Sequence, residues 1–409
     1  MPHTSLPPRR PVRLRTLVAL TAGSLALTGV LPAVALAEGR ARVTQSAADR
    51  LPPVDPTALR QAISGLPNQR VVSAVINITG SAGSWRGASG SADLATGQPA
   101  SAEARFRIGS VTKVFTAAVV LQLVAEHRVT LDRTIQHYLP GVLPGGIPPI
   151  TVAELLDHTS GLPGATAGDG EGDPALFVAD RFEHPTPAQM VASIDGQPMS
   201  FAPGTEQQYN GVNYYLLGML VEKVTGHSYA DEVTERVLRP LRLRDTSVPA
   251  PTDYRIQGPH LDGYLSISQN STAAPVDVTE QSPYPWAEGG MISSAGDLNT
   301  LMTALLDGRL LPAAERRDLM TVPDVPYLGT DQCQVNDPGQ ACFGMGLERA
   351  TIDGVTLWGK TGSRPGYTDG TFATADLQRV LTYGFTPTDE NATYNSLILA
   401  IADAALARP

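Results

Sequence analysis

The sequence predicts an α/β fold of the α+β type, with a sheet domain built from both ends of the chain and a helical domain built from its middle. Val71 to Ile78 is rich in β-branched residues, which favour strands. Residues 130–310 show helical patterns separated by long loops rich in Gly and Pro, and strand patterns return after residue 340. A sheet domain beside a helical lobe predicts a cleft between the two.

The N-terminal elements follow one another closely. A short helix is predicted at 57–66, a strand at 71–78, and turns around a second strand over 80–92. Residues 110–127 are apolar on nearly all sides, which indicates a buried helix and not a surface one.

The middle and the C-terminal part continue this pattern. Thr151-Val-Ala-Glu154 matches a capping box, which predicts a short helix ending near Gly161. Further helices are expected over 213–225 and 294–306. The elements predicted after residue 340 are strands at 343–348, 355–359, 371–375 and 380–385 and an amphipathic helix over 391–406.

The N-terminus has the features of an export signal. Basic residues including Arg9 and Arg10 precede an apolar run over 17–30 and the small-x-small sequence Ala35-Leu-Ala37. A membrane anchor is the alternative, but the run is short and ends near Pro32. We therefore expect a secreted, extracytoplasmic protein with no stable membrane span after cleavage. Sec and twin-arginine export both stay open.

These features predict the domain organisation. The expected parts are a signal peptide at 1–37, a linker at 38–56, a sheet domain formed by 57–130 and 311–409, and a mainly helical domain at 131–310.

Charge and composition exclude several classes of partner. The chain has a formal charge of −10, and removal of the four Arg of the signal leaves 26 basic against 40 acidic residues, a charge of −14. An acidic surface repels phosphate backbones, so no nucleic-acid partner is expected. The seven His show neither HxH nor HExxH spacing and the Gly-rich stretches lack a phosphate-loop pattern, so we expect no metal and no other cofactor.

Cys333 and Cys342 are the only cysteines of the sequence, and export would permit a disulfide between them. Between them lies Asp337-Pro-Gly-Gln340, with Pro and Gly where a type II turn requires them. The chain is therefore expected to double back and bring the sulfurs together in a surface staple, which contributes about 2–3 kcal/mol in the chain-entropy account. Two free thiols are the alternative.

Ser110 and Lys113 lie three residues apart at the start of the predicted buried helix, so their side chains point the same way. The free N–H groups and the dipole at the helix start favour a developing oxyanion near Ser110. Lysine is rare in this chain, with three among 30 basic residues. Because Arg cannot lose its proton whereas a buried Lys can, Lys113 is a candidate base for the Ser110 hydroxyl.

Lys360-Thr361-Gly362 forms a second motif, just after the strand predicted at 355–359. Two of the three lysines thus fall in two motifs that suit one nucleophile system. Gly362 allows a ligand to approach the backbone closely, and the strand edge could pair with an extended peptide. The Lys360 ammonium is a candidate for binding a substrate carboxylate.

Together these motifs resemble the serine penicillin-binding enzymes. FRIGSVTKVF and GKTGSRPGYT are similar to the branch that contains D-alanyl-D-alanine carboxypeptidases and class C β-lactamases, and ELLDHTSGLPG, YNGVNYYLLGMLVEKVTGHSY and WAEGGMISSAGDL resemble family segments in the expected order. The resemblance runs from about residue 57 to the C-terminus. It implies a β-lactamase/transpeptidase-like fold, with an antiparallel sheet flanked by terminal helices beside a helical domain, and an acyl-enzyme mechanism.

The resemblance also implies roles for individual residues. Ser110 would be the nucleophile, Lys113 its proton partner and Tyr209 the general base, with its pKa lowered by two flanking ammonium groups. Lys360 would bind a substrate carboxylate and tune Tyr209, and the N–H groups of Ser110 and Ser363 would form the oxyanion hole. The implied substrate-binding residues are Thr361, Gly362, Ser363, Gly211 and Trp286, although a core position for Trp286 is equally consistent.

One position departs from the family pattern. In Tyr209-Asn210-Gly211, Gly211 stands where the family has an amide side chain that helps to hold the substrate. This puts peptide and β-lactam selectivity in doubt, and Asn210 or Asn213 could substitute through a shifted loop. His158, in DHTSG, is interpreted as a helix-end histidine that binds carbonyls and not as a catalytic one.

Four functions are consistent with these motifs. The first is an exported serine D-alanyl-D-alanine carboxypeptidase-type hydrolase acting on peptidoglycan stem peptides. An esterase or a β-lactamase on the same scaffold, acting on an ester or a β-lactam, are the near alternatives. A non-catalytic wall-binding or sensor domain is the alternative from another class, but it would not need Ser110, Lys113, Tyr209 and Lys360 together.

Overall fold

The computed structural model describes residues 50–167, 173–267, 274–329, 332–333, 338–389 and 394–406. The predicted signal peptide and most of the predicted linker therefore lie outside the described residues. Within the described ranges, no helix combines the length and apolar character needed to cross a bilayer.

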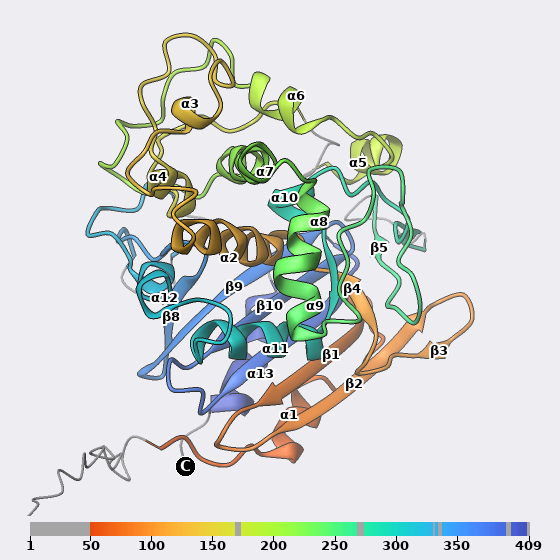
Figure 1. Ribbon diagram of the computed structural model, residues 1–409. Coiled ribbons are helices and arrows are strands. Elements are labelled where there is room, and N and C mark those ends of the chain that lie inside the picture. Colours follow the sequence, from red (N-terminus) through yellow and green to blue (C-terminus); the bar gives the residue numbers. More distant parts are fainter. Residues whose placement is uncertain are drawn as a thin grey trace, which may run out of the picture. The chain divides into compact units, whose positions relative to one another are not determined.

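The main sheet combines strands from both ends of the chain. In the described residues it has seven strands in the order β3-β2-β1-β11-β10-β9-β8, and each neighbouring pair is antiparallel. The N-terminal and C-terminal strands consequently lie side by side in Figure 1. The strands are β1 (Val71–Thr79), β2 (Trp85–Asp93), β3 (Gln98–Pro99), β8 (Glu348–Ile352), β9 (Val355–Arg364), β10 (Tyr367–Ala373) and β11 (Val380–Pro387).

Helices cover both faces of the sheet. This can be followed on the interior strand β1, where neighbouring side chains point into two different hydrophobic cores. Val75 belongs to the larger core, which contains α2 (Thr112–Ala125) and α11 (Ala295–Leu306). Ile76 points the other way, into a core shared with the terminal helices α1 (Pro56–Ala62) and α13 (Asn395–Leu406). This antiparallel sheet between helices confirms the predicted fold class.

Most helices of the middle part stack above the sheet in Figure 1, where α7 lies further from the strands than α2, whereas α11 packs directly on β1, β10 and β11. Thr151 caps α4 with both bonds of the predicted capping box. The remaining helices are η2 (Gly109–Val111), α3 (Ile135–Tyr138), α4 (Val152–Leu156), α5 (Pro174–Asp180), α6 (Pro187–Ala192), α7 (Val212–Thr225), α8 (Tyr229–Val233), η3 (Thr234–Leu238), α9 (Arg239–Leu241), α10 (Trp286–Gly289) and α12 (Ala313–Met320). The short strands are β4 (Arg105–Arg107), β5 (Tyr264–Leu265), β6 (Val276–Asp277) and β7 (Ile292–Ser294). The division into two domains stays a prediction.

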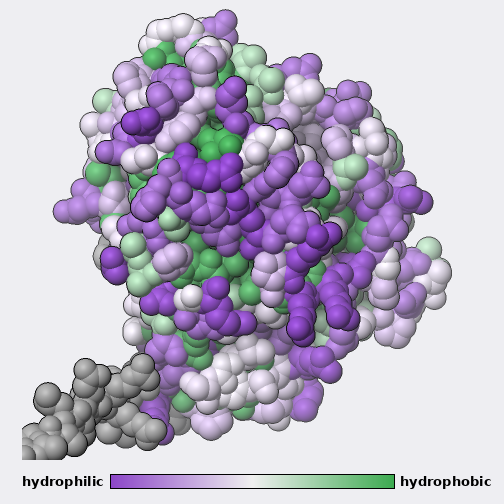
Figure 2. Space-filling model, viewed as in Figure 1, coloured by the Kyte–Doolittle hydropathy of each residue, from purple (hydrophilic) through white to green (hydrophobic). Residues whose placement is uncertain are grey.

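The face shown in Figure 2 is largely hydrophilic, with smaller apolar areas between the polar residues.

Two predictions of strand position are wrong. The strand expected over 343–348 begins only at Glu348, because the Gln207 side chain accepts from the N–H groups of Cys342 and Phe343 and donates to the Phe343 carbonyl. A side chain thus satisfies backbone groups that a strand would have paired. The Lys360 motif lies inside β9 and not after it, since the pairing with β10 continues as far as Arg364.

The cysteines form the predicted disulfide, with a Cα–Cα distance of 5.4 Å between Cys333 and Cys342. Both cysteines are buried and pack with Phe343, which itself contacts the ring of Tyr209 at 5.3 Å between centroids. The bridge is therefore more than the predicted surface staple, since it supports the packing behind Tyr209. Asp337 of the predicted turn lies outside the described residues.

Candidate active site

Ser110 lies in η2, immediately before the buried helix α2, and its side chain is partly exposed. Its Oγ is 3.0 Å from the Lys113 Nζ and 2.7 Å from the Tyr209 hydroxyl. The local sequence causes the first contact, because one helical turn separates the serine from the lysine. The structure therefore brings the predicted nucleophile and both of its predicted proton partners together.

Lys113 is almost fully buried and has an acidic partner that the sequence motifs did not predict. Its ammonium forms an ion pair with the Glu288 carboxylate and donates to the Glu288 carbonyl oxygen at 2.8 Å. Glu288 comes from α10, 175 residues further along the chain. A buried ammonium needs such a partner, since an unpaired charge in this position would be strongly destabilising.

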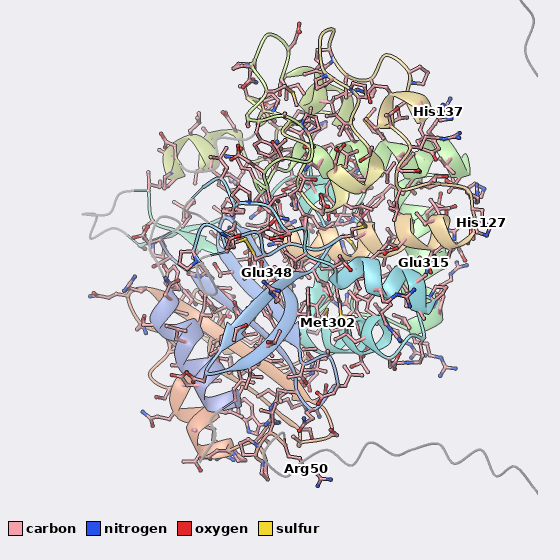
Figure 3. The ribbon with its side chains drawn as sticks, turned by 90° about the vertical axis from the view of Figure 1, so that its left-hand side faces the viewer. Arg50, His127, His137, Met302, Glu315 and Glu348 are labelled. Atoms are coloured by element: carbon pink, nitrogen blue, oxygen red, sulfur yellow. A yellow bond between two sulfur atoms is a disulfide. The ribbon has the colours of Figure 1, made fainter. Side chains whose placement is uncertain are left out.

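Lys360 is a second ammonium group close to Tyr209. The Lys360 and Lys113 ammonium groups lie 4.7 and 5.0 Å from the centroid of the Tyr209 ring. Lys360 donates to the carbonyl and hydroxyl oxygens of Thr361 at 3.1 and 3.3 Å, and its Nζ is 3.5 Å from a carboxylate oxygen of Glu348. Glu348, labelled in Figure 3, lies at the start of β8, and burial raises the pKa of its carboxyl.

The expected lowering of the Tyr209 pKa is wrong for this structure. Burial raises the pKa of the phenol above its ordinary value, and the Lys360 charge opposes this effect without overcoming it. The carboxylates of Glu288 and Glu348 raise the Tyr209 pKa further, because each places negative charge near the ring. The resting site therefore holds Tyr209 as a neutral phenol at neutral pH.

The strand that carries Lys360 also lies against the turn before Ser110. A Cβ at Gly362 would lie 2.1 Å from the Ile108 carbonyl oxygen, and one at Gly109 would lie 2.2 Å from the Ser363 carbonyl oxygen. Only glycine permits such an approach of two backbones. This contact places the backbone of Ser363 next to that of Ser110, as a two-N–H oxyanion hole would require.

At Gly211, where the family pattern has an amide side chain, the side chain of Glu288 occupies the adjoining space. A Cβ at Gly211 would lie 3.0 Å from Glu288 Oε1 and 3.1 Å from its Cγ. Asn210 donates to the carbonyls of Leu162 and Pro163, and Asn213 is bonded to Ser160. Neither asparagine replaces the missing amide in this structure.

Trp286 does not line the cleft, contrary to its predicted substrate-binding role. Its ring lies edge-on to Tyr229, with 5.1 Å between centroids, and a Cβ at Gly218 would come within 2.6 Å of it. The tryptophan therefore packs against α7, in agreement with the alternative of a core position.

His158 packs against Tyr209, but it does not bind helix carbonyls as the sequence predicts. Its Nδ1 accepts from the Asn210 backbone N–H at 3.2 Å and does not bind a helix carbonyl, and its ring lies 4.6 Å from the Tyr209 ring. Burial and the two nearby lysines hold the His158 pKa well below its ordinary value. The histidine is thus a neutral acceptor that positions Tyr209.

Two neighbouring hollows meet at this cluster. One of about 630 Å³ is lined by residues that include Ser110, Lys360, Thr361 and Asp369. A second of about 370 Å³ lies towards α6 and α7, with Met190 and Tyr215 in its wall. Tyr209 and Glu288 line both hollows. A ligand attached to Ser110 would thus have room on either side of the reacting bond.

Asp369, on β10, is a fully buried carboxyl in the wall of the larger hollow, and neither of its oxygens has a hydrogen-bond partner among the described residues. Burial raises its pKa well above the ordinary value of 3.8. Because the folded protein binds this proton more tightly than the unfolded chain, stability is full below the unfolded pKa and falls as the pH rises above it. Asp369→Asn should therefore stabilise the protein at pH 7 by about 1–3 kcal/mol.

Thermal unfolding of the Asp369→Asn variant and the parent at pH 7 and pH 4 measures this effect. The advantage of the variant should shrink towards pH 4, where Asp369 of the parent begins to be protonated in the unfolded chain as well. Asp403→Asn, at an exposed position, is the matched control and should show no such pH dependence. An equal advantage at both pH values would contradict the assignment.

Comparison with known proteins agrees with this geometry. The Beta-lactamase family model matches residues 59–406, so the chain belongs to this family, as its motifs predict. Among solved structures it is similar to the D-stereospecific amidohydrolase from Streptomyces sp., with 32% identity, a TM-score of 0.73 and coverage of 86% of this chain and 99% of that one.

Two curated relatives match over shorter lengths. Esterase EstB of Burkholderia gladioli is 32% identical over 247 residues, which are 54% of this chain and 62% of the esterase. Penicillin-binding protein 4 of Amycolatopsis lactamdurans is 30% identical over 237 residues, 56% of this chain and 58% of that protein. The chain thus spans less than two thirds of the length of either relative.

Proposed function

We propose that this protein is a serine amidohydrolase that cleaves amide bonds next to D-configured residues through an acyl-enzyme on Ser110. The observation that carries the proposal is the double contact of the Ser110 Oγ, 3.0 Å from the Lys113 amine and 2.7 Å from the Tyr209 hydroxyl. A hydroxyl held by two proton-transferring groups is the arrangement that nucleophilic catalysis needs. The likeness to a D-stereospecific amidohydrolase supports the choice of substrate.

The proposed acylation step begins with attack of the Ser110 Oγ on the substrate carbonyl. The serine proton passes to the neutral form of the Lys113 amine, and the N–H groups of Ser110 and Ser363 hold the oxyanion. Collapse breaks the C–N bond, and Tyr209, a neutral phenol, gives its proton to the leaving nitrogen while it takes one from Lys113. Water then hydrolyses the ester on Ser110.

Peptides that end in D-alanine are a subset of these substrates, and their cleavage corresponds to the carboxypeptidase activity predicted from the sequence. Lys360 and Thr361 support this subset, because an ammonium and a hydroxyl beside the reacting serine suit a terminal carboxylate. Export, which the disulfide supports, would give the enzyme access to cell-wall peptides.

An esterase is the second candidate, supported by the likeness to Esterase EstB. An ester needs no proton on its leaving oxygen when the leaving group is a good one, so the same site could cleave it with fewer groups.

A single incubation series tests these assignments. A fluorescent penicillin, a p-nitrophenyl ester and a peptide ending in D-alanyl-D-alanine are each followed by mass spectrometry and product release, with Ser110→Ala as the control. We expect an adduct of penicillin on Ser110, release of D-alanine, and loss of both in the variant. Cleavage of the ester alone would favour the esterase, rapid penicillin turnover a β-lactamase, and silence with all three would contradict an enzymatic role.

A further inference from the structure

Glu288 places a negative charge inside the cleft, where the family resemblance implies a neutral amide. Its side chain is 20% exposed, so it is accessible from the hollows while Lys113, its ion-pair partner, is 1% exposed. Glu288 lines both hollows, and its carboxylate pairs with the same Lys113 ammonium that donates to the Ser110 Oγ. We propose that Glu288 binds a free α-ammonium group on the acyl part of the substrate, which makes the enzyme selective for amides of unblocked amino acids and short peptides.

Because residue 211 is a glycine, the Glu288 side chain has room at this place in the cleft. Gly211 has ordinary helical backbone angles, φ −68° and ψ −32°, so the backbone itself does not require glycine. A Cβ here would instead press against Glu288, within 3.0–3.2 Å of three of its side-chain atoms. The glycine at 211 and the position of the Glu288 side chain therefore depend on each other, because a side chain at residue 211 would displace the glutamate.

The Glu288 carboxylate can also bind a second cation besides the Lys113 ammonium. A carboxylate has two oxygens with about four acceptor positions, so the ion pair with Lys113 does not exhaust it. Arrival of an ammonium on Glu288 would add positive charge beside Lys113 and weaken the hold of the carboxylate on that amine. Both effects favour the neutral amine that the proposed acylation step needs.

The wall of the smaller hollow indicates which acyl side chains would be accepted. Met190, Tyr215 and Tyr284 contribute flexible apolar and aromatic surface there, beside the polar side chains of Ser200 and Gln208. An α-amino acyl group with its ammonium on Glu288 could direct an apolar or aromatic side chain into this space. The proposal rests on the proposed function, since it names the substrate class of the same acyl-enzyme site.

The test compares two substrates that differ only in the ammonium group. Phenylalanine p-nitroanilide and its N-acetyl form, each as D and L enantiomer, are hydrolysed by the parent, Glu288→Gln, Gly211→Ala and Glu280→Gln. We expect the parent to prefer the free amine by about 100-fold in kcat/KM, the usual effect of one charge-assisted contact. Glu288→Gln should remove most of this preference, because it should lower kcat/KM for the free-amine substrate much more than for the acetylated one.

The other two variants separate the role of the carboxylate from general effects. Gly211→Ala should reduce the preference by displacing the carboxylate, whereas Glu280→Gln, which removes an equal charge at an exposed position, should leave it unchanged. The preference should also decline above about pH 8, where an α-amino group loses its proton. The rate with the acetylated substrate should show no such decline.

The outcomes distinguish failure of this inference from failure of the proposed function. Equal loss with both substrates in Glu288→Gln would mean that Glu288 acts only through Lys113 and would overturn the inference. Efficient cleavage of the acetylated substrate by the parent, abolished in Ser110→Ala, would also overturn it while leaving the acyl-enzyme mechanism in place. No cleavage of either substrate and no adduct on Ser110 would contradict the proposed function itself.

Discussion

Replacement of Lys113 by Arg should lower kcat/KM for amide substrates by about 10³- to 10⁴-fold, the size of effect expected when a general base is lost. The guanidinium keeps the positive charge that pairs with Glu288, but it cannot give up a proton in a protein. The lysine amine lies 3.0 Å from the Ser110 Oγ and can exist in a neutral form. The experiment therefore separates the charge of residue 113 from its ability to accept a proton.

Because Lys113 is 1% exposed, the larger Arg side chain could also disturb packing, and a second variant is needed. Lys113→Met has a similar shape without an amine and should show the same loss. Lys223→Arg makes the same chemical change at an exposed lysine and should leave activity unchanged. Acylation rates and melting temperatures of all three variants give the answer, and an Arg variant within tenfold of the parent would contradict a base at this position.

Much of the site could be predicted because its chemistry is carried by short motifs. The spacing of Ser110 and Lys113 on one helix turn fixes their contact, and the rarity of lysine draws attention to Lys360 as well. Secondary structure was predictable where the signal is local, as for the capping box that Thr151 forms at the start of α4.

The groups that balance these charges could not be predicted in the same way. Glu288 reaches Lys113 only through tertiary packing, 175 residues further along the sequence, and Glu348 reaches Lys360 through the register of the β8–β9 pair. Without them, two ammonium groups beside a phenol predict a lowered pKa for Tyr209, and with them and with burial the direction is reversed. The glycine at 211 was visible as a departure, but its meaning depends on Glu288.

Replacement of Tyr209 by Phe should give a loss that depends on the leaving group. The variant removes the hydroxyl 2.7 Å from the Ser110 Oγ but keeps the ring that packs on His158 and Phe343. Since burial raises the pKa of this phenol, it is neutral in the resting enzyme and suited to give a proton and not to remove one first. An amide nitrogen must be protonated to leave, whereas p-nitrophenolate leaves without a proton.

We therefore expect Tyr209→Phe to lower kcat/KM by about 10³-fold for an amide and by about tenfold or less for the p-nitrophenyl ester of the same acyl group. The comparison uses steady-state rates at several pH values, with Tyr138→Phe, a tyrosine outside the site, as the control. Equal losses for both substrates would assign Tyr209 to the first proton transfer, as a general base whose phenolate forms only when the substrate is bound. The ratio of the two losses thus decides which proton Tyr209 moves.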